Sequence, residues 1–209
     1  ADPASSPGPG PMPRRGLYLL TPDEPSTARL VARVGEVLAQ ATLLQYRNKR
    51  ADAALARRQL DALLPLCRAH GVPLLVNDDW RLAEEVDADG AHLGRDDGDL
   101  AAARQRLGPG AILGASCYAS LPLARAAAAA GASYVAFGRF FPSSSKPLAS
   151  PAELETLRKA KLLLSIPLVA IGGILPDNCA QLLDAGADLL AVIGGLFYRD
   201  PEQSARAFQ

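Results

Sequence analysis

Three polar residues at alternating positions are the first sign of chemistry in this sequence. Gln45, Arg47 and Lys49 follow an apolar pair and alternate with Tyr46 and Asn48. If the segment ends a β-strand, the amide and the two cations project together, while Tyr46 and Asn48 point away. An amide hydrogen-bonds a neutral heteroatom, and guanidinium and ammonium groups bind phosphate. The group therefore suits a ligand with a polar ring and a phosphate, although a solvated basic edge is the commoner explanation of such residues taken alone.

Short apolar runs alternate with amphipathic stretches along the chain from Gly16 onward. Runs bounded by turn residues predict strands, and apolar residues three or four apart predict helices. The expected strands are residues 16–20, 43–46, 73–76, 90–93, 111–114, 134–137, 168–171 and 189–192. The expected helices are residues 27–41, 52–70, a short one after 80, 100–107, 122–130, one from 151, one from 176, and 201–208.

This alternation predicts an α/β protein with one (β/α)8 barrel, a TIM barrel, because helical crossovers between buried strands imply a parallel sheet. The competing open, doubly wound sheet would be expected to carry a Gly-rich turn after its first strand, where Thr21-Pro22-Asp23 stands instead. We place the catalytic barrel at residues 16–209. Residues 1–15 form a tail rich in Pro, Gly and Ser, expected to be disordered because it has almost no large apolar residue.

Composition narrows the choice of partners and compartment. Lys plus Arg and Asp plus Glu number 22 each, so no global field attracts nucleic acid or an anionic membrane. The apolar stretches are interrupted, and we expect none to cross a bilayer. The three cysteines are odd in number and lack metal-ligand spacing, which favours packing roles and the cytoplasm. Whether the chain forms a homo-oligomer stays open.

A barrel places functional residues after the carboxyl ends of its strands. Asp78 and Asp79 follow the third expected strand, and Asp97 and Asp99 follow the fourth. Any one of them alone is more easily explained as a helix cap. Two acidic loops on adjacent strands nevertheless bring carboxylates to one rim, where Mg²⁺ is held by one or two carboxylates and phosphate oxygens. We therefore assign Asp78 and Asp97 as ligands of a Mg²⁺ cofactor.

Two further strand ends suit phosphate. After the sixth strand, Lys146 adds a cation and residues 143–145 add hydroxyls, unless they form only a floppy loop. Glycines follow the seventh and eighth strands, where backbone amides beside a helix N-terminus bind phosphate in this fold or merely form tight turns. The rim therefore favours two phosphorylated small-molecule substrates. A metal with Arg and Lys on one phosphate group suits a departing pyrophosphate.

Covalent catalysis is not expected. No nucleophilic Ser-His pair is evident, because His70 falls at a helix end and His92 within the fourth strand, positions that are more often structural. Cys117 lies near the same rim, but no histidine is placed to activate it, so a catalytic thiol is the minor alternative.

These segments resemble the thiamine-phosphate synthase family, in order and with compatible spacing, over essentially the whole chain from Gly16. The matching segments are residues 45–49, 77–78, 88–97, 114–116, 138–146, 169–174 with Asn178, and 186–193.

The resemblance implies an enzyme that condenses 4-amino-2-methyl-5-hydroxymethylpyrimidine pyrophosphate with thiazole phosphate, or its carboxylated form. The products would be thiamine monophosphate and pyrophosphate. In the Mg-assisted, dissociative reaction that it implies, the aminopyrimidine stabilises a cation as pyrophosphate leaves, and the thiazole nitrogen captures that cation. This agrees with charge stabilisers and no protein nucleophile.

The resemblance also assigns residues. It implies that the pyrimidine pyrophosphate binds to Gln45, Tyr46, Arg47, Asn48, Lys49, Asn77, Ser116 and Lys146. Among these, the catalytic residues would be Arg47, Lys49, Ser116 and Lys146. The thiazole phosphate would contact Ser143, Ser144, Ser145, Gly173, Ile193 and Gly194. The metal would again be held by Asp78 and Asp97.

Some positions depart from the family pattern. Arg95 stands where glutamine is common, Tyr118 where histidine is frequent, and Gly194 where serine is typical; Ser143 and Ser145 replace threonines. Two alternatives stay open: a related thiazole tautomerase, which releases no pyrophosphate, and a non-catalytic protein that binds thiamine precursors. The tautomerase has no leaving pyrophosphate to stabilise, so it is disfavoured by the retention of Asp78, Asp97, Arg47, Lys49 and Lys146.

Overall fold

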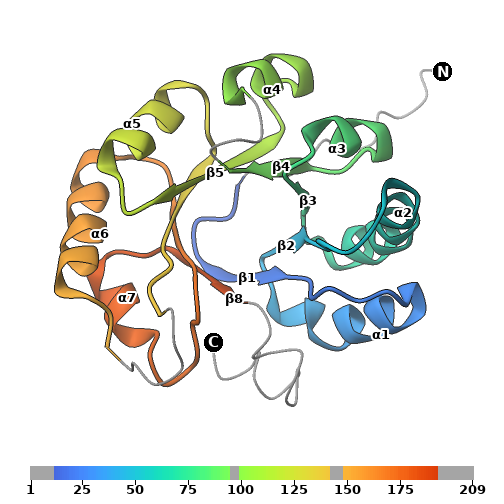
Figure 1. Cartoon of the computed structure of the whole chain (residues 1–209), viewed down its shortest axis with the longest axis horizontal. Coiled ribbons are helices and arrows are strands. Elements are labelled where there is room, and N and C mark those ends of the chain that lie inside the picture. Colours follow the sequence, from blue (N-terminus) through green and yellow to red (C-terminus); the bar gives the residue numbers. More distant parts are fainter. Residues whose placement is uncertain (1–11, 95–98, 142–147, 193–209) are drawn as a thin grey trace.

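The computed structural model describes residues 12–94, 99–141 and 148–192 and confirms the predicted barrel (Figure 1). Its eight parallel strands pair in chain order, and β8 closes the sheet against β1. The strands are β1 (Gly16–Leu20), β2 (Leu43–Tyr46), β3 (Leu74–Asn77), β4 (Gly90–Leu93), β5 (Ile112–Tyr118), β6 (Tyr134–Phe137), β7 (Leu168–Ala170) and β8 (Leu189–Val192).

The helices lie around the outside of the barrel (Figure 1). They are α1 (Thr27–Val37) with a 3₁₀ turn η1 (Leu38–Gln40), α2 (Ala53–His70), α3 (Trp80–Val86), α4 (Leu100–Leu107), α5 (Leu121–Ala129), α6 (Pro151–Leu163) and α7 (Ala180–Ala185). Five of them begin at a side-chain cap, in which a hydroxyl or carboxylate accepts a hydrogen bond from a first-turn amide. The capping residues are Ser26, Asp52, Asp79, Asp99 and Ser120.

Three expected boundaries were wrong by four residues, while the others given at both ends within the described residues agree to within one residue. Helix α1 ends at Val37 and tightens into η1, and β5 extends to Tyr118 instead of ending at Gly114. Helix α7 begins at Ala180, because the residues from Pro176 form a turn in which Asn178 accepts a hydrogen bond from the Leu175 amide at 2.8 Å. The helix expected at 201–208 lies outside the described residues.

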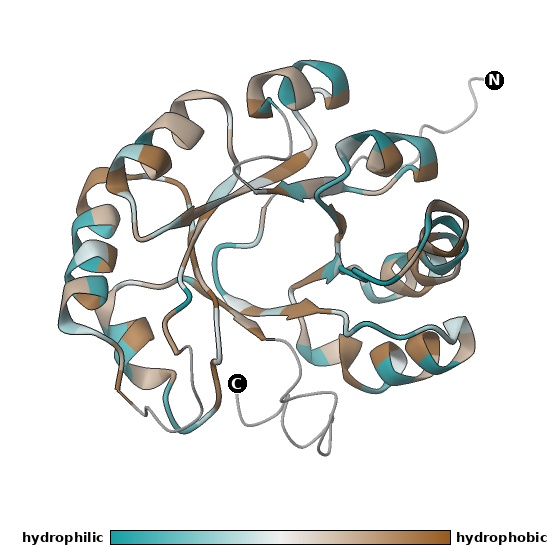
Figure 2. Ribbon diagram, viewed as in Figure 1, coloured by the Kyte–Doolittle hydropathy of each residue, from teal (hydrophilic) through white to brown (hydrophobic). Residues whose placement is uncertain are grey.

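The core has two parts, inside the barrel and between the sheet and the helices. The interior cluster consists of Tyr18, Leu20, Leu43, Leu75, Ile112, Tyr134, Ala136, Val169, Leu189 and Ala191. A larger cluster packs the outward side chains of the strands against the helices. Figure 2 shows this arrangement as predominantly hydrophobic strands inside helices whose hydrophilic residues lie mostly outward. Strand residues buried on both faces explain why the strands appear in the sequence as apolar runs.

The same kind of residue pair and the same hydrogen bond precede each even-numbered strand. Each is preceded by alanine and a small polar residue, in the pairs Ala41-Thr42, Ala88-Asp89, Ala132-Ser133 and Ala187-Asp188. The amide of each polar residue donates to the carbonyl of a leucine at the first or second position of the preceding strand, over 2.6–2.9 Å. These leucines are Leu17, Leu74, Leu113 and Leu168.

The side chains reinforce this pairing. Asp89, Ser133 and Asp188 each accept a hydrogen bond from the amide of the same leucine, at 2.8, 2.9 and 2.8 Å. Thr42 instead donates its hydroxyl to the Leu17 carbonyl at 3.3 Å. We call these four pairings the register latches. Because a one-residue slip in strand pairing would break each of them, they hold the register at the amino-terminal end of the barrel.

Gly114 is required by close packing inside the barrel. A Cβ at this position would lie 2.0 Å from Cζ of Tyr134, a fully buried ring. We expect Gly114→Ala to lower the free energy of unfolding by about 1–3 kcal/mol, because the ring has no space into which it can move. Gly35→Ala is the control, since a Cβ at Gly35 in α1 meets only Leu66, at 4.0 Å, and should stabilise by roughly 0.5–1 kcal/mol. Urea denaturation of both variants checks this, and equal stabilities would contradict it.

The end of the expected tail contacts the barrel. Met12 packs against the interior cluster, and Arg14 donates to the Ser165 carbonyl at 3.2 Å. Residues 1–11 lie outside the described part of the chain. Within the described ranges no helix is long and apolar enough to cross a membrane, and the three cysteines are unpaired.

Candidate active site

A cavity of about 580 Å³ opens at the carboxyl ends of the strands. It is lined by Leu20, Gln45, Arg47, Lys49, Asn77, Asp78, His92, Gly94, Ser116, Tyr118, Ala136, Gly138, Arg139, Ile171, Gly172 and Gly173. The structure therefore brings together seven of the predicted site residues, which come from β2, β3, β5 and the loops that follow β2, β3 and β7. Their binding and catalytic roles stay predictions.

The alternation at the end of β2 is as expected. Gln45, Arg47 and Lys49 line the cavity, and Tyr46 and Asn48 do not. Thr21, which is fully buried, fixes the backbone at Arg47 by accepting from its amide at 2.9 Å and donating to its carbonyl at 3.1 Å. The cationic side chains of Arg47 and Lys49 therefore reach the cavity from the end of β2, where the backbone of Arg47 is fixed by two hydrogen bonds.

Tyr46 and Asn48 belong to a separate network behind the strand. The Tyr46 hydroxyl donates to Oε1 of Gln59 at 2.6 Å, and Asn48 donates to the same atom at 3.1 Å. Gln59 in turn donates to the Glu24 carbonyl at 2.7 Å. Burial raises the pKa of Tyr46 to about 12, so its hydroxyl stays protonated. In this geometry the two residues position the strand end and do not reach the cavity.

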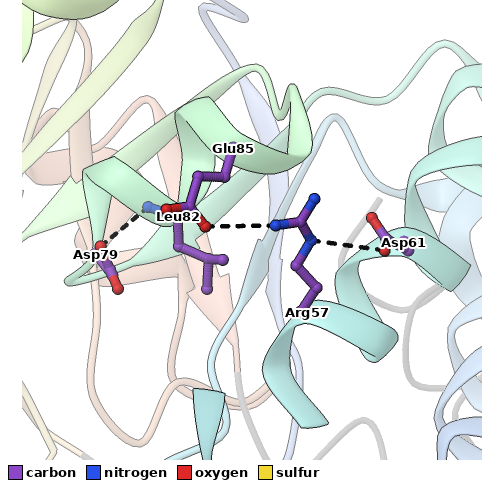
Figure 3. Close-up of polar contacts among 5 residues, drawn as sticks. All are labelled: Arg57, Asp61, Asp79, Leu82 and Glu85. Atoms are coloured by element: carbon purple, nitrogen blue, oxygen red, sulfur yellow. Dashed lines mark hydrogen bonds and ion pairs between the residues drawn. The ribbon is translucent and has the colours of Figure 1, made fainter. Parts of the chain in front are cut away.

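The acidic pair after β3 divides into two roles. Asp79 caps α3 by accepting a hydrogen bond from the Leu82 amide at 3.0 Å (Figure 3). Nearby, Arg57 on α2 joins the two helices by pairing with Glu85 on α3 at 3.5 Å, and it also pairs with Asp61 on α2 at 3.8 Å. Asp78 has a left-handed backbone with φ 68° and lines the cavity. A non-glycine residue seldom adopts this conformation. Asp78 is therefore held in an unusual backbone conformation at the cavity.

Asp78 fits a Mg²⁺ ligand by chemistry and by place. Asp78 is an exposed residue that lines the same cavity as Arg47 and Lys49, and one or two carboxylates with phosphate oxygens suffice for Mg²⁺. In the described ranges no three His, Cys, Asp or Glu residues cluster as a metal site. The second predicted ligand, Asp97, lies outside those ranges.

Ser116 and His92 form the pair that the sequence did not reveal. Nε2 of His92 lies 2.8 Å from Oγ of Ser116, and Nδ1 lies 2.7 Å from the Tyr134 hydroxyl. Nothing in the sequence indicated this contact, and the expectation that covalent catalysis is absent stays a prediction. The pairing arises because β4 and β5 are neighbours and His92 is in register with Gly114, two residues before Ser116.

The loop after β7 offers backbone donors. Gly172 and Gly173 have φ values of 104° and 66°, and among the described residues their amides have no hydrogen-bond acceptor. Asn178, which is buried, donates to the Gly173 carbonyl at 3.0 Å, and Phe141 donates to the Gly172 carbonyl at 3.1 Å. Because α7 begins only at Ala180, these loop amides and not a helix N-terminus form the candidate phosphate cradle.

Two exposed side chains extend the site on the side of β5 and β6. Tyr118 has a left-handed backbone with φ 56°, is 46% exposed and follows a shift in the β5–β6 register. Arg139 follows β6 and adds a third described cation to the lining. Arg139 was missed because it stands among aromatic residues, but its place two residues after a strand was the available signal.

Several predicted site residues fall outside the described parts of the chain. For the metal and the pyrimidine pyrophosphate these are Asp97 and Lys146. For the thiazole phosphate they are Ser143, Ser144, Ser145, Ile193 and Gly194.

Comparison with known proteins gives one consistent result. The family model described as thiamine monophosphate synthase matches residues 17–196. The thiamine-phosphate synthase of Aromatoleum aromaticum is 55% identical over 194 residues, which cover 92% of this chain and 93% of that protein. That of Methylobacillus flagellatus is 56% identical over 198 residues, 94% of each. The solved thiamine phosphate pyrophosphorylase of Pyrococcus furiosus superposes with a TM-score of 0.80, at 33% identity, over 93% of this chain and 94% of that one.

The barrel fold, the residues that line its cavity and the matches to these relatives all indicate the same family, and the matches span nearly the whole chain. The chain therefore belongs to the thiamine monophosphate synthase family and is an enzyme of thiamine biosynthesis.

Proposed function

We propose that this enzyme joins 4-amino-2-methyl-5-hydroxymethylpyrimidine pyrophosphate to thiazole phosphate, or to its carboxylated form, in the cytoplasm. The products are thiamine monophosphate and pyrophosphate. The observation that carries the proposal is that the cations Arg47 and Lys49 line the same cavity as the polar side chains Gln45 and Ser116. A ligand with a phosphate and a polar ring matches both sets, because the phosphate suits the two cations and the ring suits the amide and the hydroxyl.

The chain's own residues suit a dissociative reaction. Gln45 and Ser116 orient the pyrimidine ring, while Arg47 and Lys49 neutralise the charge that develops on the departing pyrophosphate. The amides of Gly172 and Gly173 hold the phosphate of the second substrate, which positions its nitrogen for attack on the pyrimidine methylene carbon. The C–O bond to pyrophosphate breaks, and the C–N bond to the thiazole forms.

Mg²⁺ would be held by Asp78 and Asp97 together with pyrophosphate oxygens. When bound, the ion supplies positive charge that stabilises the leaving group. The proposal for Asp97 rests on its sequence position after β4, the strand next to β3, which Asp78 follows directly.

Pyrophosphate release tests the proposed function directly. Purified protein is given both substrates, with and without Mg²⁺, and with each substrate omitted in turn. We expect release only when both substrates and the metal are present. Binding of thiazole phosphate without release would instead favour the tautomerase or a non-catalytic binding protein.

Asp97→Ala should abolish Mg²⁺-dependent turnover, by about 100-fold or more, because it removes a proposed ligand of the ion. Asp99→Ala is the matched control in the same loop. Asp99 caps α4 by accepting from the Ala101 amide at 2.8 Å, so its loss should lower stability by about 1 kcal/mol without affecting turnover. Pyrophosphate release and thermal melting of both variants give the comparison, and near-normal activity of Asp97→Ala would remove it from the metal site.

A further inference from the structure

A continuous chain of hydrogen bonds crosses the barrel beneath the cavity. Nε2 of Gln45 lies 2.8 Å from the Tyr18 hydroxyl, which lies 2.6 Å from the Tyr134 hydroxyl. The Tyr134 hydroxyl also lies 2.7 Å from Nδ1 of His92, and Nε2 of His92 lies 2.8 Å from Oγ of Ser116. Both ends of the chain, Gln45 and Ser116, line the cavity. Two cavity-lining side chains from β2 and β5, which are not neighbouring strands, are therefore joined through the barrel interior.

The rings between them are tightly held. Tyr18 and Tyr134 are 1% and 0% exposed and meet edge to face, with centroids 5.6 Å apart. His92 stacks on Tyr134 at the same centroid distance, with an angle of 18° between the planes. Burial raises the pKa of both tyrosines above their ordinary value, so both hydroxyls stay protonated. Each hydroxyl can therefore donate one hydrogen bond.

The amide of Gln45 sets the direction in which these hydrogens point. Its NH₂ group donates to Tyr18 and cannot accept. Among the described residues the Tyr18 hydroxyl contacts only Gln45 and Tyr134, so its hydrogen goes to Tyr134. A buried hydroxyl without an acceptor would be destabilising. Tyr134 then donates to Nδ1 of His92.

His92 completes the order. With Nδ1 accepting, the neutral imidazole carries its proton on Nε2 and donates it to Oγ of Ser116. The Ser116 hydroxyl is then left to donate into the cavity, and Oε1 of Gln45 is left to accept there. His92 cannot take the proton of Ser116 while its own Nε2 is protonated. The Ser-His pair is thereby arranged for hydrogen bonding and not for nucleophilic attack.

We propose that Tyr18, Tyr134 and His92 are positioning residues, which fix Gln45 as an acceptor and Ser116 as a donor toward the substrate. This inference rests on the proposed function for the identity of the substrate. The matching ligand is a heterocycle with an amino group for Gln45 and an unprotonated ring nitrogen for Ser116, which is the chemistry of an aminopyrimidine.

Nitrogen NMR of the imidazoles tests the order without any turnover. The chain has two histidines, and His70 lies at the exposed end of α2. In the ¹⁵N-histidine-labelled His70→Gln variant every imidazole signal belongs to His92. At about pH 8, where an ordinary imidazole is neutral, we expect Nε2 to carry the proton and Nδ1 to be unprotonated. A proton on Nδ1 would overturn the proposal and would mark Ser116 as the donor to His92.

Substitution of the central tyrosine tests the positioning role. In the same background, Tyr134→Phe keeps the ring and removes the hydroxyl that bonds Nδ1, so His92 should become a mixture of tautomers. We expect KM for the pyrimidine pyrophosphate to rise about tenfold, while KM for the thiazole phosphate stays unchanged. Ile112→Val is the control, because it trims the same interior cluster without touching the hydrogen-bond chain.

The outcomes separate this proposal from a merely structural role. Equal changes in both KM values, or the same changes in Ile112→Val, would overturn it. If Tyr134→Phe does not fold, Tyr18→Phe removes the neighbouring hydroxyl, and a rise confined to the pyrimidine KM is again the expected result. If the wild-type enzyme releases no pyrophosphate, the proposed function fails, but the tautomer of His92 still decides the hydrogen-bond order.

Discussion

Replacing Arg47 by alanine is expected to lower kcat by about 100- to 1,000-fold, the usual loss when one preorganised group that stabilises developing charge is removed. Thr21 holds the backbone of residue 47 through two hydrogen bonds, neither of which involves the arginine side chain. The strand end should therefore keep its place, and the loss should come from the missing cation. Steady-state kinetics of pyrophosphate release measures the effect.

Arg57→Ala is the matched control for this experiment. Arg57 lies on α2, outside the cavity lining, and pairs with Asp61 and Glu85 on the outer surface (Figure 3). Such half-exposed ion pairs contribute about 0–1 kcal/mol, so activity should be unchanged. If Arg47→Ala retained more than a tenth of the wild-type kcat, Arg47 would not be the group that stabilises the departing pyrophosphate.

The second large effect is expected from Gly173→Ala. A Cβ on Gly173 would lie 2.3 Å from the Phe141 carbonyl oxygen, so the loop after β7 must move. Because the amides of this loop are the proposed donors to the thiazole phosphate, KM for that substrate should rise by about 10- to 100-fold, the loss of one or two charge-assisted hydrogen bonds. KM for the pyrimidine pyrophosphate should stay within about twofold of the wild-type value, because a change at one site has little effect on a separate site.

The backbone strain of this change can be measured separately. Gly71, which ends α2, has φ +67°, almost the value of +66° at Gly173, but an added Cβ there meets no atom within 4 Å. Gly71→Ala therefore reports the left-handed conformation alone, about 1–2 kcal/mol of stability, with no change in either KM. A Gly173→Ala enzyme that lost only this stability, and kept its KM for thiazole phosphate, would place the phosphate elsewhere.

The parts of the fold and site that follow from local patterns could be predicted from the sequence. Alternation along a strand placed Gln45, Arg47 and Lys49 on one face, because side chains two residues apart must share a side of the sheet. The abrupt change from apolar to acidic residues located Asp78, and Asp79 caps α3 as the alternative interpretation required. Interruption of apolar runs at regular intervals was sufficient to give the barrel.

The contacts that the sequence could not show are those between strands. His92 stands alone in an apolar run, and its bond to Ser116 depends on the register of β4 with β5. The contact between Tyr18 and Tyr134 joins residues 116 apart in the chain. The start of α7 was misjudged for another reason: a proline at a first helical turn also fits the tight turn that Asn178 stabilises.

The four register latches have a consequence for how such a barrel can change during evolution. Each latch lies within one strand–helix–strand unit, joining β1 to β2, β3 to β4, β5 to β6 or β7 to β8. The unit that carries its own alignment is therefore a quarter of the barrel. Exchange of segments between related barrels should be tolerated best when the junctions follow an even-numbered strand, since such a junction leaves every latch with both of its partners.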